Sequence, residues 1–388
     1  EIASCLVGSE MCIRDRYRIE GSVLTIEDGA ISSVTWVSAG AGGALEETVK
    51  NAFTLALGEG SAANVSLGYL NGTLTTSGDK VYQITNTGGT KINLNGVYNR
   101  GETLPSGNLN YRGDIWMDIS GGAFGIISGG VTNEWRTKLQ TSTLTGDTHV
   151  QLSGNATAEH VIGGNNKGAS TTLTGNTNVT VKDNAIVAGA IIGGSTSAHN
   201  AVTTITGNTS VLVTNVQYSN TAQNLDGGLS NSYIIGGSSW SSNTTSGTTI
   251  QGSTSATINL NGITLSGTEE HNSFVKTIIG GSYGNVNNAG TVNNINGDTS
   301  VSIIGREGIT FTGDIIGGSF ENSGQAQYTI GGNSSISISG GSTFTGNIYG
   351  GSYSKVPGNT GSTMTTAGNI TVELGTCLLY TSDAADEL

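Results

Sequence analysis

Polar and apolar residues alternate with a period of two in short segments along much of the chain. Clear examples are NTNVTV at 176–181, DTSVSI at 298–303 and SSISIS at 334–339. Successive side chains of a strand point to opposite faces, so this alternation predicts strands with one buried face and one face in solvent.

A second pattern, two apolar residues followed by a Gly pair and usually by Ser, recurs between these segments. Copies occur at 161–164, 191–195, 234–238, 278–282, 315–319 and 348–352, with a weaker copy at 126–130. We interpret each copy as a short strand closed by a sharp corner, at which Gly supplies a positive φ without steric cost.

A third pattern, apolar-x-Gly followed by Asn, Asp or Ser, leads into the alternating segments. Copies occur at 144–150, 173–179, 205–211, 250–256, 295–301 and 330–336, with a partial copy at 367–372. The six full copies begin 29 to 45 residues apart, and the extra length falls in expected loops such as 215–232. This pattern predicts a short strand ending in a turn, where Asn or Asp tolerates the left-handed conformation.

The order of the patterns never changes, which indicates one structural unit repeated along the chain. Each unit has too little apolar surface to fold alone, but stacked units bury a continuous core and place like residues above one another at about 4.8 Å per rung. We therefore predict an all-β fold, a right-handed parallel β-helix of about seven or eight coils. A propeller of four-stranded blades is the alternative, and it requires antiparallel hairpins.

The repeats are expected over residues 113–376, with clear register beginning near Gly113. Residues 17–112 lack the repeat and are interpreted as an irregular β-rich upstream portion, either irregular coils or part of the same array. Within it, 44–57 has a helix-like pattern, whereas 80–84 and 91–98 carry strand signals.

The two ends are expected to be foreign to the protein. CLVGSEMCIRDR at 5–16 can be encoded by DNA containing TGTATAAGAGACA, the reverse complement of TGTCTCTTATACA in a coding sequence for CLLYTSDAADE at 377–387. A shared inverted end is typical of transposon-based sequencing adapters, so we expect 1–16 and 377–388 to be translated adapter and the rest to be an open fragment. All three Cys, at positions 5, 12 and 377, lie in these segments, which removes disulfides, zinc sites and thiol nucleophiles from consideration.

Composition agrees with a turn-rich β protein. Of 388 residues 62 are Gly and two are Pro, and only 11% are charged. Helical bundles, coiled coils and collagen need compositions that differ from this one. The net charge of −13 argues against nucleic acid as a partner.

Reiterated GNTxVxI alternation followed by IIGGS or GNIYGGS, in a chain rich in Gly, Thr and Asn, resembles the passenger regions of bacterial type V autotransporters, especially large repetitive adhesin-like ones. The likeness covers roughly residues 113–376. It implies a location at the cell surface or outside a Gram-negative bacterium, with attachment through a C-terminal outer-membrane barrel that this sequence does not include.

β-Helix enzymes that degrade polysaccharides are the competing class, and they require paired carboxylates or a carboxylate cluster that holds Ca²⁺. The closest acidic groupings are Asp114 with Asp118, Glu269 with Glu270, and Asp298 with Glu307, which we interpret as solvated surface charge. Asp114 and Asp118 are expected on one face of a strand.

The remaining chemistry-bearing residues follow no catalytic pattern. The four His, at 149, 160, 199 and 271, show no metal-ligand spacing, and His149 is expected to face solvent. GxSxG elbows and phosphate loops are absent from the sequence. We therefore expect no catalytic residues, no metal and no cofactor.

Aromatic residues follow several Gly-pair corners, where loops begin. They are Trp240, Tyr283, Phe320 and Tyr353. Loops on a rigid scaffold carry function, so these rings are candidate binding residues for a glycan or a protein. The alternative is that they cover the corner of the apolar stack.

The predicted function is an adhesin-like or structural display scaffold with no catalytic centre, whose partner is a host or environmental glycan or a surface protein. The alternatives are a polysaccharide lyase or glycoside hydrolase, and a pure spacer.

Overall fold

The structure, a computed structural model, describes the strands between residues 17 and 85 by their backbone, and residues 91–97 and 107–379 apart from internal gaps. The gaps are 133–138, 167–169, 198–201, 215–232, 242–246, 263–272, 275, 286–290, 323–325, 356–362 and 376–377.

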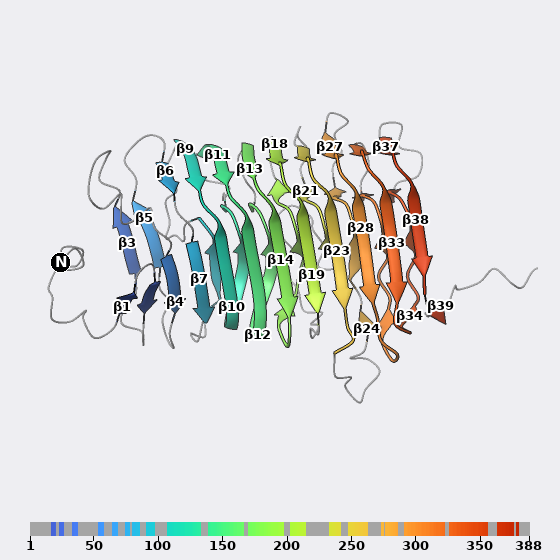
Figure 1. The fold of residues 1–388 in the computed structure, drawn as a ribbon, viewed down its shortest axis with the longest axis horizontal. Coiled ribbons are helices and arrows are strands. Elements are labelled where there is room, and N and C mark those ends of the chain that lie inside the picture. The colour runs from blue at the N-terminus through green and yellow to red at the C-terminus, as the bar shows by residue number, and fades with distance from the viewer. Residues whose placement is uncertain are drawn as a thin grey trace, which may run out of the picture.

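The described elements are β-strands, and they stack into a rod in which the chain winds coil upon coil (Figure 1). They form sheets of 19, nine, five, four and two strands. Among the described strand pairs, β1 (Tyr17–Glu20) with β2 (Val23–Ile26) is antiparallel, and every other pair is parallel. The fold is therefore a parallel β-helix, as predicted, and a propeller of antiparallel hairpins is ruled out.

The 19-stranded sheet, here the main sheet, holds both the alternating segments and the strands that precede the Gly pairs. Its long strands lie side by side along the rod in Figure 1. They are β10 (Ile115–Ser128), β12 (Thr148–Ile162), β14 (Thr177–Lys182), β19 (Thr209–Thr214), β23 (Thr254–Asn259), β28 (Thr299–Ile304), β33 (Ser334–Ser339) and β38 (Ile370–Leu374). Its short strands are β15 (Ile186–Val187), β16 (Ile191–Ile192), β20 (Tyr233–Ile235), β25 (Thr277–Ile279), β30 (Ile315–Ile316) and β35 (Ile348–Tyr349).

Three further sheets close the coils. The nine-stranded sheet contains β6 (Leu74–Ser77), β9 (Gly107–Arg112), β11 (Leu139–Thr145), β13 (Ser170–Thr174), β18 (Val202–Ile205), β22 (Gly247–Ile250), β27 (Val292–Ile295), β32 (Gln327–Ile330) and β37 (Thr363–Thr366). The five-stranded sheet, here the corner sheet, contains β17 (Thr196–Ser197), β21 (Ser239–Ser241), β26 (Tyr283–Asn285), β31 (Phe320–Glu321) and β36 (Tyr353–Ser354). The four-stranded sheet contains β24 (Ser273–Phe274), β29 (Thr310–Phe311), β34 (Thr343–Phe344) and β39 (Leu378–Leu379), of which β39 lies in the expected adapter segment.

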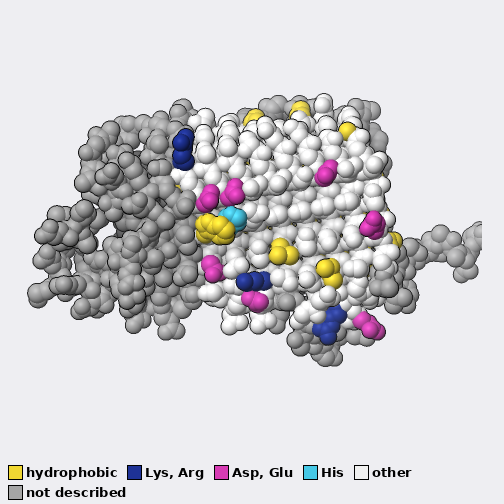
Figure 2. Space-filling model, in the orientation of Figure 1, with side chains coloured by type: hydrophobic (Ala, Val, Ile, Leu, Met, Phe, Trp, Pro, Cys, Tyr) yellow, Lys and Arg dark blue, Asp and Glu magenta, His cyan; other side chains and the backbone are white. Residues whose placement is uncertain are grey.

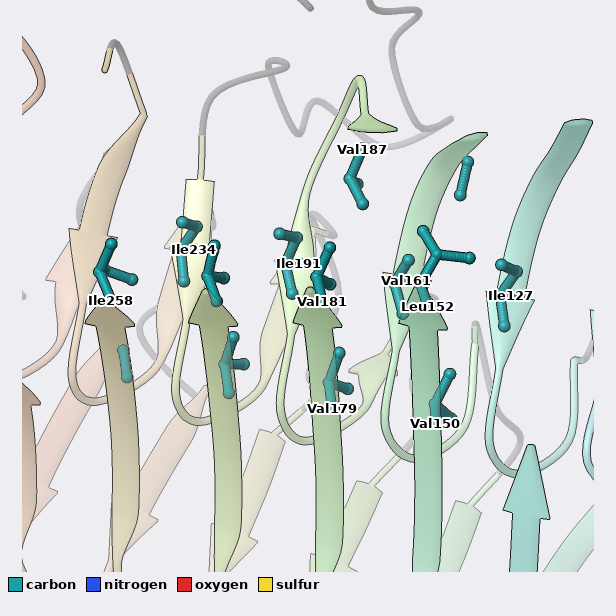
Figure 3. Packing of buried hydrophobic residues seen from close by; sticks show 14 of the residues in the cluster. Ile127, Val150, Leu152, Val161, Val179, Val181, Val187, Ile191, Ile234 and Ile258 are labelled. Atoms are coloured by element: carbon teal, nitrogen blue, oxygen red, sulfur yellow. The ribbon is translucent and has the colours of Figure 1, made fainter. Parts of the chain in front are cut away.

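The interior is a set of aliphatic ladders. Val150, Val179 and Val211 lie in register on successive coils and are at most 1% exposed. Figure 3 shows such residues at matching heights on neighbouring strands, pointing to the same side. Strict in-register stacking keeps each apolar side chain between two of its own kind, so the core runs along the rod without interruption.

The two apolar residues before each Gly pair serve two separate cores. The first of each pair, such as Ile234 and Ile278, belongs to the main core inside the coils. The second, such as Ile235 and Ile279, belongs to a smaller core shared with the corner sheet. Both are buried because adjacent residues of a strand face opposite sides and each side is covered.

The Gly pairs have a different role from the predicted one. Positive φ is found at Gly113, Gly146 and Gly175 in the turns, but at none of the described Gly pairs that follow the double apolar motif. The pairs are required for close packing instead, because a Cβ on Gly236 would lie 2.5 Å from the carbonyl oxygen of Gly280 in the next coil.

Buried hydroxyl groups hold the corners. The Thr that opens each alternating strand faces inward, and Thr177 Oγ1 donates to the carbonyl oxygen of Gly193 (2.6 Å) in its own coil. The Ser after each Gly pair joins successive coils, as when Ser195 N–H donates to Ser238 Oγ (3.1 Å). Thr177 and Ser195 are thus buried polar residues whose hydroxyl groups are hydrogen-bonded.

The turn before each long strand carries a polar ladder. Asp114 Oδ1 accepts from the backbone N–H of Asp147 (2.8 Å), and Asp147 Oδ1 accepts from that of Asn176 (2.7 Å). The same bond continues through Asn208, Ser253, Asp298, Asn333 and Asn369. Among described non-Gly residues only Asp183 has a positive φ, so the turn residues are selected for this bond rather than for the left-handed conformation expected of them.

The upstream portion extends the same array. β2 pairs in parallel with β4 (Phe53–Leu57), and β4 pairs with β7 (Lys80–Thr85). Both β7 and β8 (Ile92–Asn95) pair in parallel with β10. β3 (Ser33–Val37) and β5 (Asn64–Gly68) form the separate two-stranded sheet. The strand signal at 80–84 is confirmed by β7, and that at 91–98 is confirmed over Ile92–Asn95; residue 98 lies outside the described residues.

The helix expected over 44–57 is wrong at its C-terminal end, because residues 53–57 form β4; residues 44–52 lie outside the described part. FTLAL also alternates in polarity, and pairing with β2 and β7 overrides its helical propensity.

Candidate functional site

The four predicted aromatic residues fall on equivalent parts of the corner sheet. Tyr283 pairs directly with Phe320, and Phe320 with Tyr353, while Trp240 lies one position further along its strand. The side chain of Trp240 lies outside the described residues. The structure therefore brings three of the predicted rings into one column.

This column is packed. Tyr283 is 1% exposed and Phe320 is 5% exposed, and their ring centroids are 5.6 Å apart. Phe320 stacks parallel to Tyr353 at 5.7 Å, and Tyr353 stacks on Tyr349 at 3.9 Å. Burial raises the pKa of Tyr283 well above its ordinary value.

The rings of Tyr283 and Phe320 are thus part of the smaller core, packed against the second Ile of each corner. A ligand has no access to their faces in this arrangement, and the alternative interpretation, that these two rings cover the corner of the apolar stack, describes their surroundings. Tyr353 is half-buried and remains a candidate for binding.

A different aromatic group stands on the outer face of the main sheet. Trp116 on β10 and His149 on β12 are in register on adjacent strands, and their rings stack with centroids 3.6 Å apart and planes 9° from parallel. Trp116 is 48% exposed. Figure 2 shows a histidine beside a large hydrophobic side chain, with acidic side chains around them, on a face that is otherwise mostly uncharged.

Three carboxylates surround this pair along the strands. Asp118 lies two residues after Trp116 on the outward face of β10. Asp114, which was expected on the same face of a strand, lies in the turn before β10, where its carboxylate accepts from the backbone N–H of Asp147. Asp147 occupies the position of Asp114 in the next coil. Asp118 Oδ1 accepts from Gln151 Nε2 (2.9 Å), which fixes the carboxylate against β12.

The imidazole of His149 is half-buried rather than fully in solvent. Desolvation lowers its pKa below 6.5, and the negative charges of Asp147 and Asp114 offset only part of that effect. At neutral pH the ring is therefore uncharged, and its Nδ1 lies 3.4 Å from Asn178 Nδ2 on β14.

The corresponding outward positions in later coils carry small polar residues. From His149 the row continues through Asn178 on β14 to Ser210 on β19, Ser255 on β23, Ser300 on β28 and Ser335 on β33. The aromatic pair is therefore a local departure from a repeated polar surface, on a scaffold whose interior is the same in both places.

The other predicted groupings do not form a site among the described residues. Asp298 belongs to the turn ladder and Glu307 lies in an exposed turn. His160 is buried and accepts a hydrogen bond from Ala190 N–H at Nδ1 (3.0 Å). The remaining candidates, Glu269, Glu270, His199 and His271, lie outside the described residues.

Two searches of the described residues gave negative results. They contain no group of three or more His, Cys, Asp or Glu side chains placed to hold a metal ion. They also contain no helix with the length and apolar character needed to cross a bilayer.

Sequence reasoning noted Asp114 and Asp118 but passed over the Trp between them. The signal was present: a period of two places Trp116 on the outer face with both carboxylates, and alignment of the turn patterns places His149 at the same height. Their stacking could be expected from that alignment.

Comparison with protein-family models, with curated proteins and with solved structures finds no match for this chain.

Proposed function

We propose that the chain is part of the surface-exposed passenger region of a bacterial type V autotransporter and acts as an adhesin-like display scaffold. The proposal places it at the cell surface or outside a Gram-negative bacterium. Its partner is a host or environmental glycan or a surface protein, and it has no catalytic centre.

The observation that carries the proposal is that the inward residues of each coil repeat along the rod, whereas the outward residues vary. Most inward positions of the long strands carry apolar or hydroxyl residues that repeat from coil to coil, whereas the outward position changes from Trp116 to His149, Asn178 and Ser210 without a change of register. A rod built in this way presents variable side chains at a constant spacing of about 4.8 Å, which suits multivalent contact in which weak contacts add through avidity.

The test is an array of mucin-type glycans, plant polysaccharides and extracellular matrix proteins, probed with the full chain while released sugars are assayed. Retention that rises with surface density, without new sugar ends, is expected for an adhesin. The matched control is a variant that keeps the fold and loses the exposed aromatic pair, Trp116→Ser with His149→Ser.

Two results would overturn the proposal. New reducing or unsaturated sugar ends would identify a polysaccharide-degrading enzyme, and the carboxylates Asp114 and Asp118 would then be the first to replace. Absence of retention on every surface, at a density where avidity operates, would leave a structural spacer.

A further inference from the structure

We propose that Trp116, His149 and the carboxylates beside them form a docking site for an arginine side chain of a protein partner. The inference rests on the proposed adhesive function, because it names the chemistry of the partner that the scaffold would hold. It is carried by three observations: ring exposure, ring stacking and charge.

The first observation concerns access. His149 covers one face of the Trp116 indole at 3.6 Å, and almost half of the Trp116 side chain is still exposed. The exposed part of the indole lies on the outer face of the main sheet, where the outward residues of β10 alternate with buried ones. A flat cation can lie against that surface, and Trp is the side chain that attracts cations most strongly through its ring.

The second observation concerns rigidity. The Trp116 ring is held in place by the His149 ring that stacks on it. His149 in turn lies near Asn178 on the next strand, and Asn178 accepts a hydrogen bond from Ser210 Oγ (2.7 Å). A ring that is already ordered loses little conformational entropy when it binds a ligand.

The third observation concerns charge. Asp118 lies on β10 two residues after Trp116, and Asp114 and Asp147 lie in the turns that precede β10 and β12. Among the described residues, Lys91 forms an ion pair with Glu159, whereas Asp118 and Asp147 form none with a Lys or Arg side chain. Uncharged His149 adds nothing to balance these carboxylates at neutral pH.

A planar guanidinium fits this combination better than the other candidate ligands. It can stack on an indole and pair with a carboxylate at the same time, whereas the compact ammonium of Lys does not stack. A neutral sugar would use the ring but not the charge. A metal ion would use the charge but not the ring.

The experiment is a titration of the full chain, labelled with ¹⁵N at Trp indole nitrogens, with an acetylated and amidated Gly-Arg-Gly peptide. The matched ligand carries citrulline, which has the shape of arginine without its charge. We expect the citrulline peptide to bind about fivefold more weakly, and Trp116→Ser to weaken arginine binding about fivefold. Asp118→Asn should weaken it about threefold and make it less sensitive to salt.

Asp298→Asn is the control variant, because Asp298 occupies the turn position of Asp114 in a coil whose outward residue is Ser300. It should leave arginine binding unchanged. Thermal unfolding of each variant verifies that the rod is intact. Transfer of the site, by Ser300→Trp, Ser302→Asp and Ser335→His in the Trp116→Ser chain, should restore binding, since these positions are in register on β28 and β33.

Equal binding of the arginine and citrulline peptides, or full binding by Trp116→Ser, would overturn the inference. Trp116-dependent binding of a neutral trisaccharide without arginine binding would overturn it in favour of a sugar site. Retention on the array without arginine binding would refute the docking site and leave the adhesive function standing. Arginine binding without retention on any surface would refute the adhesive function and leave the docking site standing.

Discussion

The inward and outward faces of the main sheet follow different rules although they alternate along the same strands. Facing inward, Val179, Val211 and Val301 repeat the same kind of residue coil after coil and are about 1% exposed. Facing outward, the row that begins with Trp116 changes to Ser in later coils. Repetition is therefore imposed where each coil must fit the next, and it is relaxed where the side chain meets solvent.

The same contrast separates interior coils from the last described coil. Ile336 and Ile338 on β33 are 1% exposed, whereas Val372 and Leu374, which pair with them on β38, are 42% and 44% exposed. The residue types are alike, so burial comes from the neighbouring coil and not from the strand itself. Stability in such an array is a sum of contacts between neighbours.

The largest loss of stability is expected from a charge at an inward position of the main sheet. Ile258→Asp on β23 places a carboxylate where the native side chain is fully buried, and it should lower the free energy of unfolding by about 4 kcal/mol. Its neighbour Thr257 faces outward, so Thr257→Asp should stay within about 0.5 kcal/mol. Denaturant unfolding of both variants measures the difference, and equal losses would contradict the assignment of faces.

A smaller loss is expected where the coils approach most closely. Gly236→Ala would bring a Cβ to 2.5 Å from the Gly280 carbonyl oxygen and 2.7 Å from the carbonyl carbon of Ser255. Backbone atoms would have to move, at a cost of about 2–3 kcal/mol. Gly375→Ala is the control, because its Cβ would meet nothing nearer than 3.3 Å. A harmless Gly236→Ala would show that the corner is not closely packed.

The sequence predicted which side chains of the long strands face inward and that the coils stack in register. A period of two determines which side chains point inward, and the constant order of the three patterns implies stacking in register. Roles that depend on the adjacent coil were not predictable from one coil. The bond from Ser195 N–H to Ser238 Oγ joins residues 43 apart, and nothing local in the IIGGS pattern reveals it.

The exposed aromatic residues were predicted less well from the sequence. The aromatic residues chosen from the sequence follow the Gly-pair corners, and Tyr283 and Phe320 lie inside a second core that a single-core picture of the coil does not contain. Trp116 was missed because the repeats themselves do not mark it. The aromatic pair stands out only after the strands are aligned, when the same row is seen to continue as Asn178 and then as Ser in later coils.

Lys276 is a buried charged residue, and its effect on stability depends on pH. Lys276 is 2% exposed, and its Nζ donates to the carbonyl oxygen of Gly189 (2.5 Å). Burial lowers the pKa of Lys276 to about 8 from 10.5, so the unfolded chain binds more protons between these values and stability rises with pH. We expect a gain of about 2 kcal/mol between pH 8 and 9.5.

Lys276→Met should remove that rise, whatever its effect on stability at neutral pH. The measurement is denaturant unfolding at half-unit steps from pH 7.5 to 9.5. Above pH 10 stability should fall again, because burial raises the pKa of Tyr349 to about 12 and that of Tyr283 still further, so their unfolded forms ionise first. A flat profile in the native chain would show that the Lys276 ammonium is solvated.

The smallest effect on stability is expected at the outward pair, where the change restores what later coils already have. Trp116→Ser with His149→Ser should cost about 1 kcal/mol, which is the scale of one exposed aromatic stack. The pKa of His149 lies below 6.5 in the folded chain, so its contribution is complete above pH 6.5 and is lost as the pH falls toward the folded value. Trp116→Ser alone exposes the imidazole and should move the His149 pKa back toward 6.5, which an NMR titration of that ring would follow. A His149 pKa that does not respond to loss of the indole would mean that the two rings are not stacked in solution.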